Sequence, residues 1–343
     1  MEYAAIDLHS RRSQIRIVDA EGTVVLDCRI DTTRAAFAST FGARASMRIL
    51  LEASTEAEWV AQCLEGLGHT VVIGDPNYTL MYGQRSRRIK TDKRDAAALA
   101  EACRCGIYRP THRVSTVQWR ERQRQTVRFQ LVRQRTALIN LTRALLRQEG
   151  HRLPSGAPEC MEARLDRLAL STTVLAILTP LRRTMRALNT TLRSIDRAIE
   201  ARAQGDPIVR LLMTAPGVGP VVALNFRAVL DDPARFGGEA QRVAAFIGVV
   251  PRENSSAERR HKGRITKVGP ATLRSLLVQA SWAVCRSHRA DTAALRAWAQ
   301  SLAARRGKRI AIVALARRLA RMLFAMWRDG TPFRPVMRAT VAA

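Results

Sequence analysis

YAAID, residues 3–7, is an apolar run that closes on a carboxylate, and this pattern predicts a short buried strand. Residues 14–18 and 23–30 alternate apolar and polar side chains on either side of a turn at 19–22, so we expect two further strands beside it. Residues 48–52 form another apolar run that ends in an acid. These patterns together predict a sheet.

Helices and strands alternate in the next part of the sequence. Trp59–Leu67 predicts a helix, and Thr70–Ile73 predicts one more strand. Thr91 is placed to cap a helix over Asp92–Cys105. Three adjacent strands followed by this alternation is the order of an α/β domain with an RNase H-like (RuvC-like) sheet, which we assign to residues 1–108.

The composition indicates a polyanionic partner. The 343 residues include 57 Lys and Arg against 29 Asp and Glu, a net charge of +28. Such an excess repels itself and attracts nucleic acid, and arginine can place two hydrogen bonds on one phosphate. A hydrophobic content of 47% is normal for packed domains and excludes a natively disordered chain.

The sequence shows no sign of export or of a membrane span. No basic-then-apolar leader is present, and no segment approaches the roughly 18 apolar residues that a span needs. We expect a cytoplasmic, nucleoid-associated protein that does not contact a membrane. Its six cysteines are scattered, and the pair Cys103 and Cys105 lacks a second pair for a zinc site, so we expect reduced, mostly structural thiols.

The middle of the chain predicts a helical linker, residues 109–205. Residues 109–152 hold eleven arginines and two glutamates. A second helical stretch, 162–203, could return antiparallel to the first. The first helix has apolar residues at a heptad-like spacing that suggests a coiled-coil arm, namely Val127, Leu131, Leu138, Leu141 and Leu145.

The arginines of this arm are candidate nucleic-acid contacts. Arg120, Arg124 and Arg128 recur every fourth residue, so they share one helix face. A solvated surface is the alternative. Like charges at this density repel one another without a polyanion, and we therefore favour binding of RNA or DNA.

The remainder, residues 206–343, predicts a mainly helical domain. Its Pro-Gly-Val-Gly turn, 216–219, lies between two helical runs, as in a helix-hairpin-helix, where Gly217 and Gly219 would present backbone amides to a phosphate. The same turn could be only a helix corner. A polar, basic loop at 252–267 follows, and three helices end near Trp327.

Four acids stand out by position. Asp7 and Glu52 end predicted strands, and Asp92 and Asp95 lie three apart on one helix face. Each alone reads as a turn, surface or helix-end acid. Clustered carboxylates repel one another unless a cation lies between them, and Mg²⁺ prefers oxygen ligands, so together they predict a Mg²⁺ site for phosphoryl transfer.

Several motifs resemble one family in linked order. They are Ala5-Ile6-Asp7, Leu50-Leu51-Glu52-Ala53, the segment 90–96, Pro216-Gly217-Val218-Gly219, the segment 246–251, Asn254-Ser255-Ser256 and the segment 263–269. This set is similar to the insertion-sequence one-ten (IS110) family of transposases, which are bridge-RNA-guided recombinases. The resemblance covers most of the chain and implies an Asp-Glu-Asp-Asp tetrad in a RuvC-like domain and a C-terminal transposase domain.

The resemblance also implies a serine nucleophile. It falls on Ser256, although Ala257 replaces the glycine that usually follows it, and Ser255 is the substitute. Nearby cations would contact phosphate and assist loss of the hydroxyl proton, namely Arg259, Lys262, Arg264 and Lys267. Without the resemblance this segment reads as an ordinary phosphate-binding loop.

We therefore expect a transposase, a site-specific recombinase that cuts and rejoins donor and target DNA through a phosphoserine. Its partners would be both DNAs and further copies of itself in a dimer or tetramer. The resemblance adds a guide (bridge) RNA, and it implies composite active sites in which Ser256 of one chain works with the carboxylates of another. A RuvC-like hydrolytic nuclease of the junction-resolvase type would need only the carboxylates, and a non-catalytic nucleic-acid-binding protein only the arginines.

Overall fold

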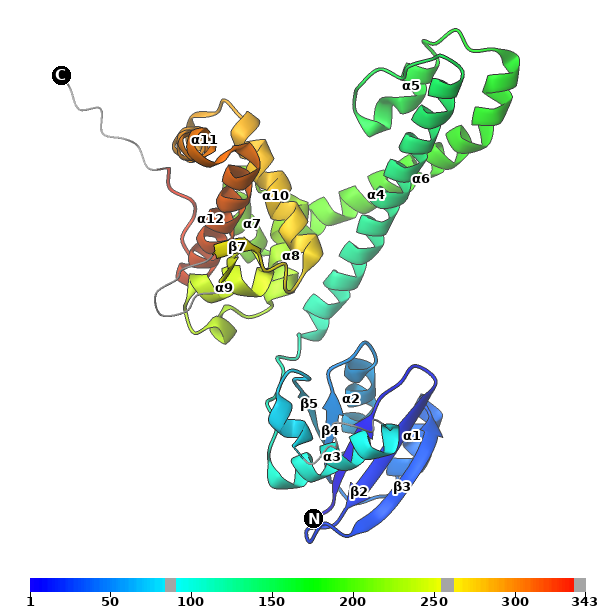
Figure 1. The fold of residues 1–343 in the computed structure, drawn as a ribbon, viewed down its shortest axis with the longest axis vertical. Coiled ribbons are helices and arrows are strands. Elements are labelled where there is room, and N and C mark those ends of the chain that lie inside the picture. The colour runs from blue at the N-terminus through cyan, green and yellow to red at the C-terminus, as the bar shows by residue number, and fades with distance from the viewer. Residues whose placement is uncertain (84–90, 254–261, 336–343) are drawn as a thin grey trace, which may run out of the picture. The chain divides into compact units, whose positions relative to one another are not determined.

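The computed structural model describes residues 1–83, 91–253 and 262–335, and its contacts divide the chain into two compact units (Figure 1). We call Met1–Arg113 the N-terminal unit and Val114–Ala343 the C-terminal unit. The three-part division with boundaries after residues 108 and 205 stays a prediction.

The N-terminal unit is built on a five-stranded sheet in the order β3-β2-β1-β4-β5. β1 lies at its centre, antiparallel to β2 and parallel to β4, which buries Ala4 to Ile6 completely. All the predicted strands are confirmed, with small shifts at their ends. The strands are β1 (Tyr3–Asp7), β2 (Arg12–Val18), β3 (Val24–Asp31), β4 (Arg48–Glu52) and β5 (Thr70–Gly74).

Helices cover both faces of this sheet. α1 (Arg34–Phe41) and α2 (Ala57–Gly66) pack on one face through apolar side chains such as Phe37 and Leu64. α3 (Asp92–Cys105) packs on the other through Leu99 and its neighbours, after the short 3-10 turn η1 (Thr79–Tyr82). The α3 boundaries agree with the prediction. α1 was not predicted, since its eight residues show little periodicity beyond two phenylalanines.

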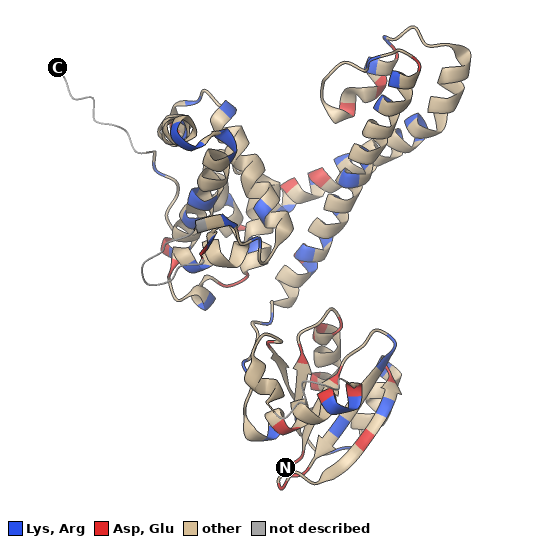
Figure 2. Ribbon diagram, in the orientation of Figure 1, with Lys and Arg blue, Asp and Glu red and all other residues tan. Residues whose placement is uncertain are grey.

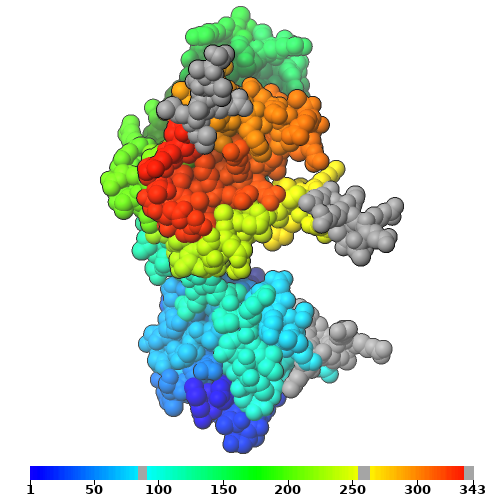
Figure 3. Space-filling model, turned by 90° about the vertical axis from the view of Figure 1, so that its left-hand side faces the viewer, coloured from blue at the N-terminus to red at the C-terminus, as the bar shows by residue number. Residues whose placement is uncertain are grey.

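The C-terminal unit is mainly helical (Figure 1). Its core forms around α12, whose buried Leu315, Leu319 and Leu323 pack against α9 and α10. Figure 3 shows α9 and α12 side by side on one face. The helices are α4 (Thr116–Gln148), α5 (Met161–Leu165), α6 (Thr172–Gly205), α7 (Pro207–Met213), α8 (Pro220–Leu230), α9 (Ala240–Ile247), α10 (Ala271–Arg286), α11 (Ala293–Arg306) and α12 (Lys308–Asp329).

Shorter elements join these helices. η2 (Pro158–Cys160), η3 (Pro233–Phe236) and η4 (Ala290–Thr292) are 3-10 turns. The segment predicted as a loop at 252–267 contains an antiparallel ribbon of β6 (Pro251–Glu253) and β7 (Lys262–Ile265), which corrects that prediction. All three residues of β6 are exposed, so no alternation of apolar residues marks this strand in the sequence.

α4 and α6 form an antiparallel pair that we call the arm. Arg128 Nε lies 2.6 Å from Asp196 Oδ1, and Arg135 Nη1 lies 3.4 Å from Asn189 Oδ1, so residue numbers rise along one helix as they fall along the other. The predicted apolar stripe is only partly buried: Leu138 and Leu145 are half-buried and pack against an apolar cluster that α4 shares with α5 and α6. Val127 and Leu141 are 55% and 47% exposed. The buried α4 residues include polar ones because its base packs through hydrogen bonds, and they are Gln118, Glu121, Gln125, Ile139, Thr142 and Leu146.

Two further observations concern the whole chain. Across the described ranges, no helix combines the length and the apolar character that crossing a membrane requires. All six cysteines lie in described segments and are free thiols.

Candidate functional site

The four predicted carboxylates meet around one cavity of about 290 Å³ in the N-terminal unit. Asp7 ends β1 and Glu52 ends β4, and these strands are parallel neighbours, so their carboxyl ends lie at the same edge of the sheet. Asp92 and Asp95 reach the cavity from the first turn of α3, which Thr91 caps through its side-chain oxygen. The chain order thus brings three elements to one point.

Asp7 is the carboxylate at the end of the central strand. It is only 8% exposed. Burial raises the pKa of its carboxyl above the ordinary value; His9 lowers this pKa, and the charges of Asp95, Asp92 and Glu52 raise it further. A carboxylate cluster of this kind is stabilised by a bound cation.

His9 lies between two of the acids. Its Nε2 is 3.4 Å from Asp7 Oδ2 and 3.4 Å from Asp92 Oδ1. Arg29 Nη2 lies 3.5 Å from the other oxygen of Asp92. His9 was not among the predicted site residues, although its place two residues after Asp7, just beyond the strand end, was a usable signal.

Tyr82 fixes the orientation of Glu52. The Tyr82 hydroxyl donates a hydrogen bond of 2.5 Å to Glu52 Oε2. It comes from η1, thirty residues further along the chain, so no local pattern could have paired the two. Both residues line the cavity.

The donor set fits a divalent cation. Asp7, His9 and Asp92 each offer one ligand atom, and these atoms all lie within 4.8 Å of one another. Carboxylate oxygens suit Mg²⁺, Mn²⁺ and Ca²⁺, whereas an imidazole nitrogen adds affinity for transition metals. The residues present therefore fit a divalent cation.

The predicted serine site is described only at its margins. Ser255, Ser256 and Arg259 lie outside the described residues, and for Lys262 only the backbone is described. Arg264, in β7, and Lys267 are exposed.

The residues that follow β7 pack closely against the backbone at the end of α9. The Lys267 amide donates to the Gly248 carbonyl at 3.1 Å. A Cβ at Gly248 would lie 2.2 Å from the Val268 oxygen, so only glycine allows this approach.

The predicted Pro-Gly-Val-Gly turn joins α7 to α8. Gly217 has a φ of +76°, and a Cβ there would lie 2.7 Å from the Ala280 oxygen, so this glycine is required for packing on α10. Gly219 is the N-cap of α8, with open space around it. Of the two, Gly219 lies better for a phosphate contact.

The three predicted arm arginines differ in their surroundings. Arg120 is exposed, and its guanidinium lies 4.7 Å from the Trp119 ring centre. Arg124 Nη1 lies 3.4 Å from Glu121 Oε2, and Arg128 Nε lies 2.6 Å from Asp196 Oδ1. Two of the three are therefore already paired with acids of the arm.

Comparisons with known proteins connect both units to transposases. A DEDD transposase model of the IS110 group, described as "Transposase", matches residues 4–150, and a model described as "Transposase IS116/IS110/IS902 family" matches residues 209–296. The chain is 32% identical to a probable family 20 transposase of Pseudomonas aeruginosa, over 96% of this chain and 98% of the relative. The chain belongs to the IS110/IS116/IS902 family of transposases.

Other relatives agree with this membership. The transposase for insertion sequence element IS1111A of Coxiella burnetii is 29% identical over 94% of this chain and 88% of its own length. The transposase for insertion sequence element IS1328 of Yersinia enterocolitica is 26% identical over 83% of this chain and 85% of its own length. Membership in this family implies that the transposase cuts and rejoins DNA, and its DEDD domain suggests a divalent metal.

Proposed function

We propose that this transposase is a Mg²⁺-dependent, bridge-RNA-guided recombinase that joins donor and target DNA through a phosphoserine at Ser256. The observation that carries the proposal is the convergence of Asp7, Glu52, Asp92 and Asp95 on one cavity. Metal-dependent phosphoryl transfer uses carboxylates in this way, and acids that share one cavity repel one another unless a cation lies between them.

The N-terminal unit is, in this proposal, RNase H-like and specifically RuvC-like. The strand order β3-β2-β1-β4-β5, with β2 antiparallel and β4 parallel to β1, supports it. So does the position of the acids at the ends of β1 and β4.

The chemistry would proceed by two displacements. Two Mg²⁺ ions, when bound, supply activation of the attacking oxygen and stabilisation of the leaving one. The Ser256 Oγ attacks the phosphorus of a strand and loses its proton, a serine–phosphate ester forms, and the bond to one deoxyribose oxygen breaks. A deoxyribose hydroxyl then attacks this ester and releases the serine, so the number of phosphodiester bonds is unchanged and no ATP is needed.

The cations around the serine have a separate role in this scheme. Arg259, Lys262, Arg264 and Lys267 would neutralise charge on the phosphate oxygens. Base pairing with the guide RNA would supply sequence specificity, while the protein reads backbone and shape. Rejoining two DNA sites requires at least two protomers, and we infer a dimer or tetramer that works at the nucleoid in the cytoplasm.

The test is a search for the covalent adduct. Purified protein with its co-purified RNA is incubated with Mg²⁺ and end-labelled donor and target DNA, and the products are separated on a denaturing gel. We expect a protein-linked DNA band in wild type that is lost in Ser256→Ala and in Asp7→Ala, while Ser255→Ala retains it. Ribonuclease treatment before DNA is added should also abolish it.

Other results would replace the proposal with a neighbouring one. Cleaved ends without any adduct, unaffected by Ser256→Ala, would indicate a hydrolytic nuclease. A band lost in Ser255→Ala but not in Ser256→Ala would move the nucleophile by one residue. Full activity in Asp7→Ala would remove the carboxylate cavity from the mechanism.

A further inference from the structure

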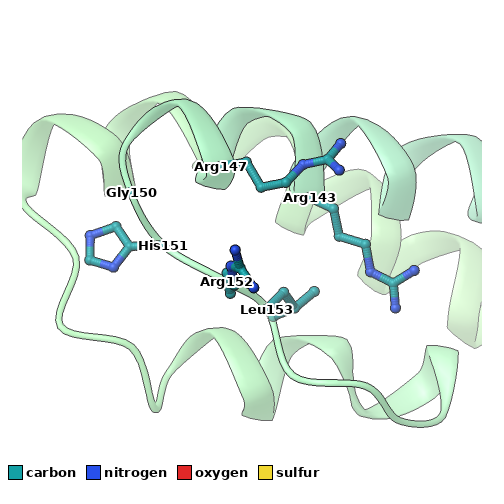
Figure 4. A pocket seen from close by; sticks show the side chains of 6 residues that line it. All are labelled: Arg143, Arg147, Gly150, His151, Arg152 and Leu153. Atoms are coloured by element: carbon teal, nitrogen blue, oxygen red, sulfur yellow. The ribbon is translucent and has the colours of Figure 1, made fainter.

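The tip of the arm contains a cavity lined by cations. Its volume is about 650 Å³, and its lining residues are Arg143, Arg147, Gly150, His151, Arg152 and Leu153. Arg143 and Arg147 extend from the last turns of α4, and Arg152 comes from the loop that follows (Figure 4). No acid lines this cavity within the described part of the chain.

Most other arginines around the tip are already engaged. Three acids near the tip each face an arginine: Glu159 lies 2.6 Å from Arg135, Glu162 lies 2.9 Å from Arg186, and Asp166 lies 2.7 Å from Arg182. Figure 2 shows Lys and Arg along both arm helices.

The cavity arginines differ from these. Between residues 91 and 253, where the structure is continuous, no ion pair joins Arg143, Arg147 or Arg152 to an acid. Glu149 is adjacent in sequence, but it is exposed and does not line the cavity. The three guanidiniums thus repel one another with no anion between them.

The backbone holds these cations together. Gly150 has a φ of +78°, its amide donates to the Arg147 carbonyl at 3.2 Å, and the His151 amide donates to the Leu146 carbonyl at 2.8 Å. This is the Schellman turn that ends a helix and reverses the chain. It returns Arg152 to the side of α4 that carries the other two arginines.

The loop after the turn is also fixed. Buried Arg164 donates to the carbonyls of Pro154, Ala157 and Cys160 at 2.6, 2.8 and 3.2 Å. Leu153, on the cavity wall, packs against the apolar cluster of the tip. The backbone that carries these cations is therefore fixed before a ligand binds, which lowers the entropy cost of binding.

We propose that this cavity, which we call the tip pocket, binds the phosphodiester backbone of a nucleic acid. Arginine pairs with phosphate through two parallel hydrogen bonds, and three arginines outweigh the roughly half negative charge at the end of α4. The volume is in the range of sites that hold small ligands or part of a larger one. The inference extends the proposed function by assigning a nucleic-acid contact far along the arm, but it does not require the carboxylate chemistry.

The test measures binding as a function of salt. Full-length Asp7→Ala protein, which we expect to bind without cutting, serves as the background. Binding is measured directly, so the result can be interpreted even if the catalytic proposal fails. Fluorescence anisotropy is recorded with labelled duplex DNA and with structured RNA. The slope of log Kd against log salt concentration counts the phosphate contacts. In the variant Arg143→Gln/Arg147→Gln/Arg152→Gln we expect the magnitude of this slope to decrease by about one for each arginine lost, and Kd at low salt to rise about tenfold or more.

Matched variants distinguish binding in the tip pocket from attraction by the overall positive charge of the arm. Arg133→Gln/Arg183→Gln/Arg197→Gln removes the same charge from exposed arm positions outside the tip pocket and should change the slope much less. The single change Arg152→Gln, in the exposed loop, should lower the slope by about one without risk to the helices. Thermal melting monitored by circular dichroism checks that each variant is folded.

Each outcome decides the proposal. A change with DNA alone identifies donor or target DNA as the ligand, a change with RNA alone identifies the guide, and both results support a phosphate site. An unchanged slope with both nucleic acids, or an equal change in the matched control, overturns the tip pocket.

Discussion

Asp7 combines deep burial with three acidic neighbours, and both raise the pKa of its carboxyl. Without metal, the ionised side chain destabilises the fold it belongs to. Asp7→Asn should therefore raise the metal-free stability of the N-terminal unit by about 1 kcal/mol, or roughly 4 °C in Tm, and should abolish the stabilisation that Mg²⁺ gives to wild type.

Differential scanning fluorimetry with and without Mg²⁺ measures both effects. Asp19→Asn, in a turn of the same unit and away from the cavity, is the control and should keep the Mg²⁺ response. A metal-dependent rise in Tm that persists in Asp7→Asn would contradict a role for Asp7 in metal binding.

His9 offers the cavity its one nitrogen ligand among the described lining residues. Because imidazole contributes more to Mn²⁺ than to Mg²⁺ affinity, we expect His9→Ala to weaken Mn²⁺ about tenfold or more while Mg²⁺ changes less. Titration of Mn²⁺ by electron paramagnetic resonance, with Mg²⁺ as competitor, gives both constants. Equal loss for both ions would show that His9 only positions the carboxylates.

At the level of elements, burial decides what the sequence could predict. β1, β4 and α3 were predicted with correct ends because each is buried or capped by residues local to it, such as Thr91 and Gly106. The four acids followed from those ends. Tyr82 was not predictable, because it reaches Glu52 only through the tertiary fold.

The arm shows the opposite case. Its apolar spacing predicted a buried stripe along α4, but the residues buried at the base of this helix include Glu121 and Gln125. Gln125 donates a hydrogen bond to Glu121, which also forms an ion pair with Arg202. A polar contact between helices leaves no hydrophobic period in the sequence. The partners that set the buried face come from α6 and α8, which lie far along the chain.

Arg122 joins the base of the arm to α8. Its Nε and Nη2 donate to the carbonyls of Ala228 and Val229 at 2.9 and 2.7 Å, and burial lowers its pKa. Arg122→Gln loses at least one of two charge-assisted bonds to buried acceptors, so we expect a loss of about 2 kcal/mol, or roughly 4–8 °C in Tm, for the C-terminal unit.

Thermal melting of the full chain checks this value. Arg120→Gln is the matched control, since Arg120 is exposed two residues away, and it should melt within about 1 °C of wild type. If Arg122→Gln melts like the control, the bonds to α8 contribute nothing to stability.

The charge of the whole molecule is unevenly divided. Residues 114–343 hold 41 of the 57 Lys and Arg but 15 of the 29 acids, a net +26, whereas residues 1–113 carry only +2. The unit with the carboxylate cavity is thus almost neutral. Attraction of a polyanion must come mainly from the C-terminal unit.

This division predicts where nucleic acid protects the protein. Arginine modification by phenylglyoxal, read by mass spectrometry with and without bound DNA or RNA, should show protection concentrated in residues 114–343, with the N-terminal unit protected mainly beside its cavity, at Arg29. High salt should remove the protection, because counterion release drives the binding. Protection spread evenly over both units would mean that local geometry, and not the +26 field, selects the binding surface.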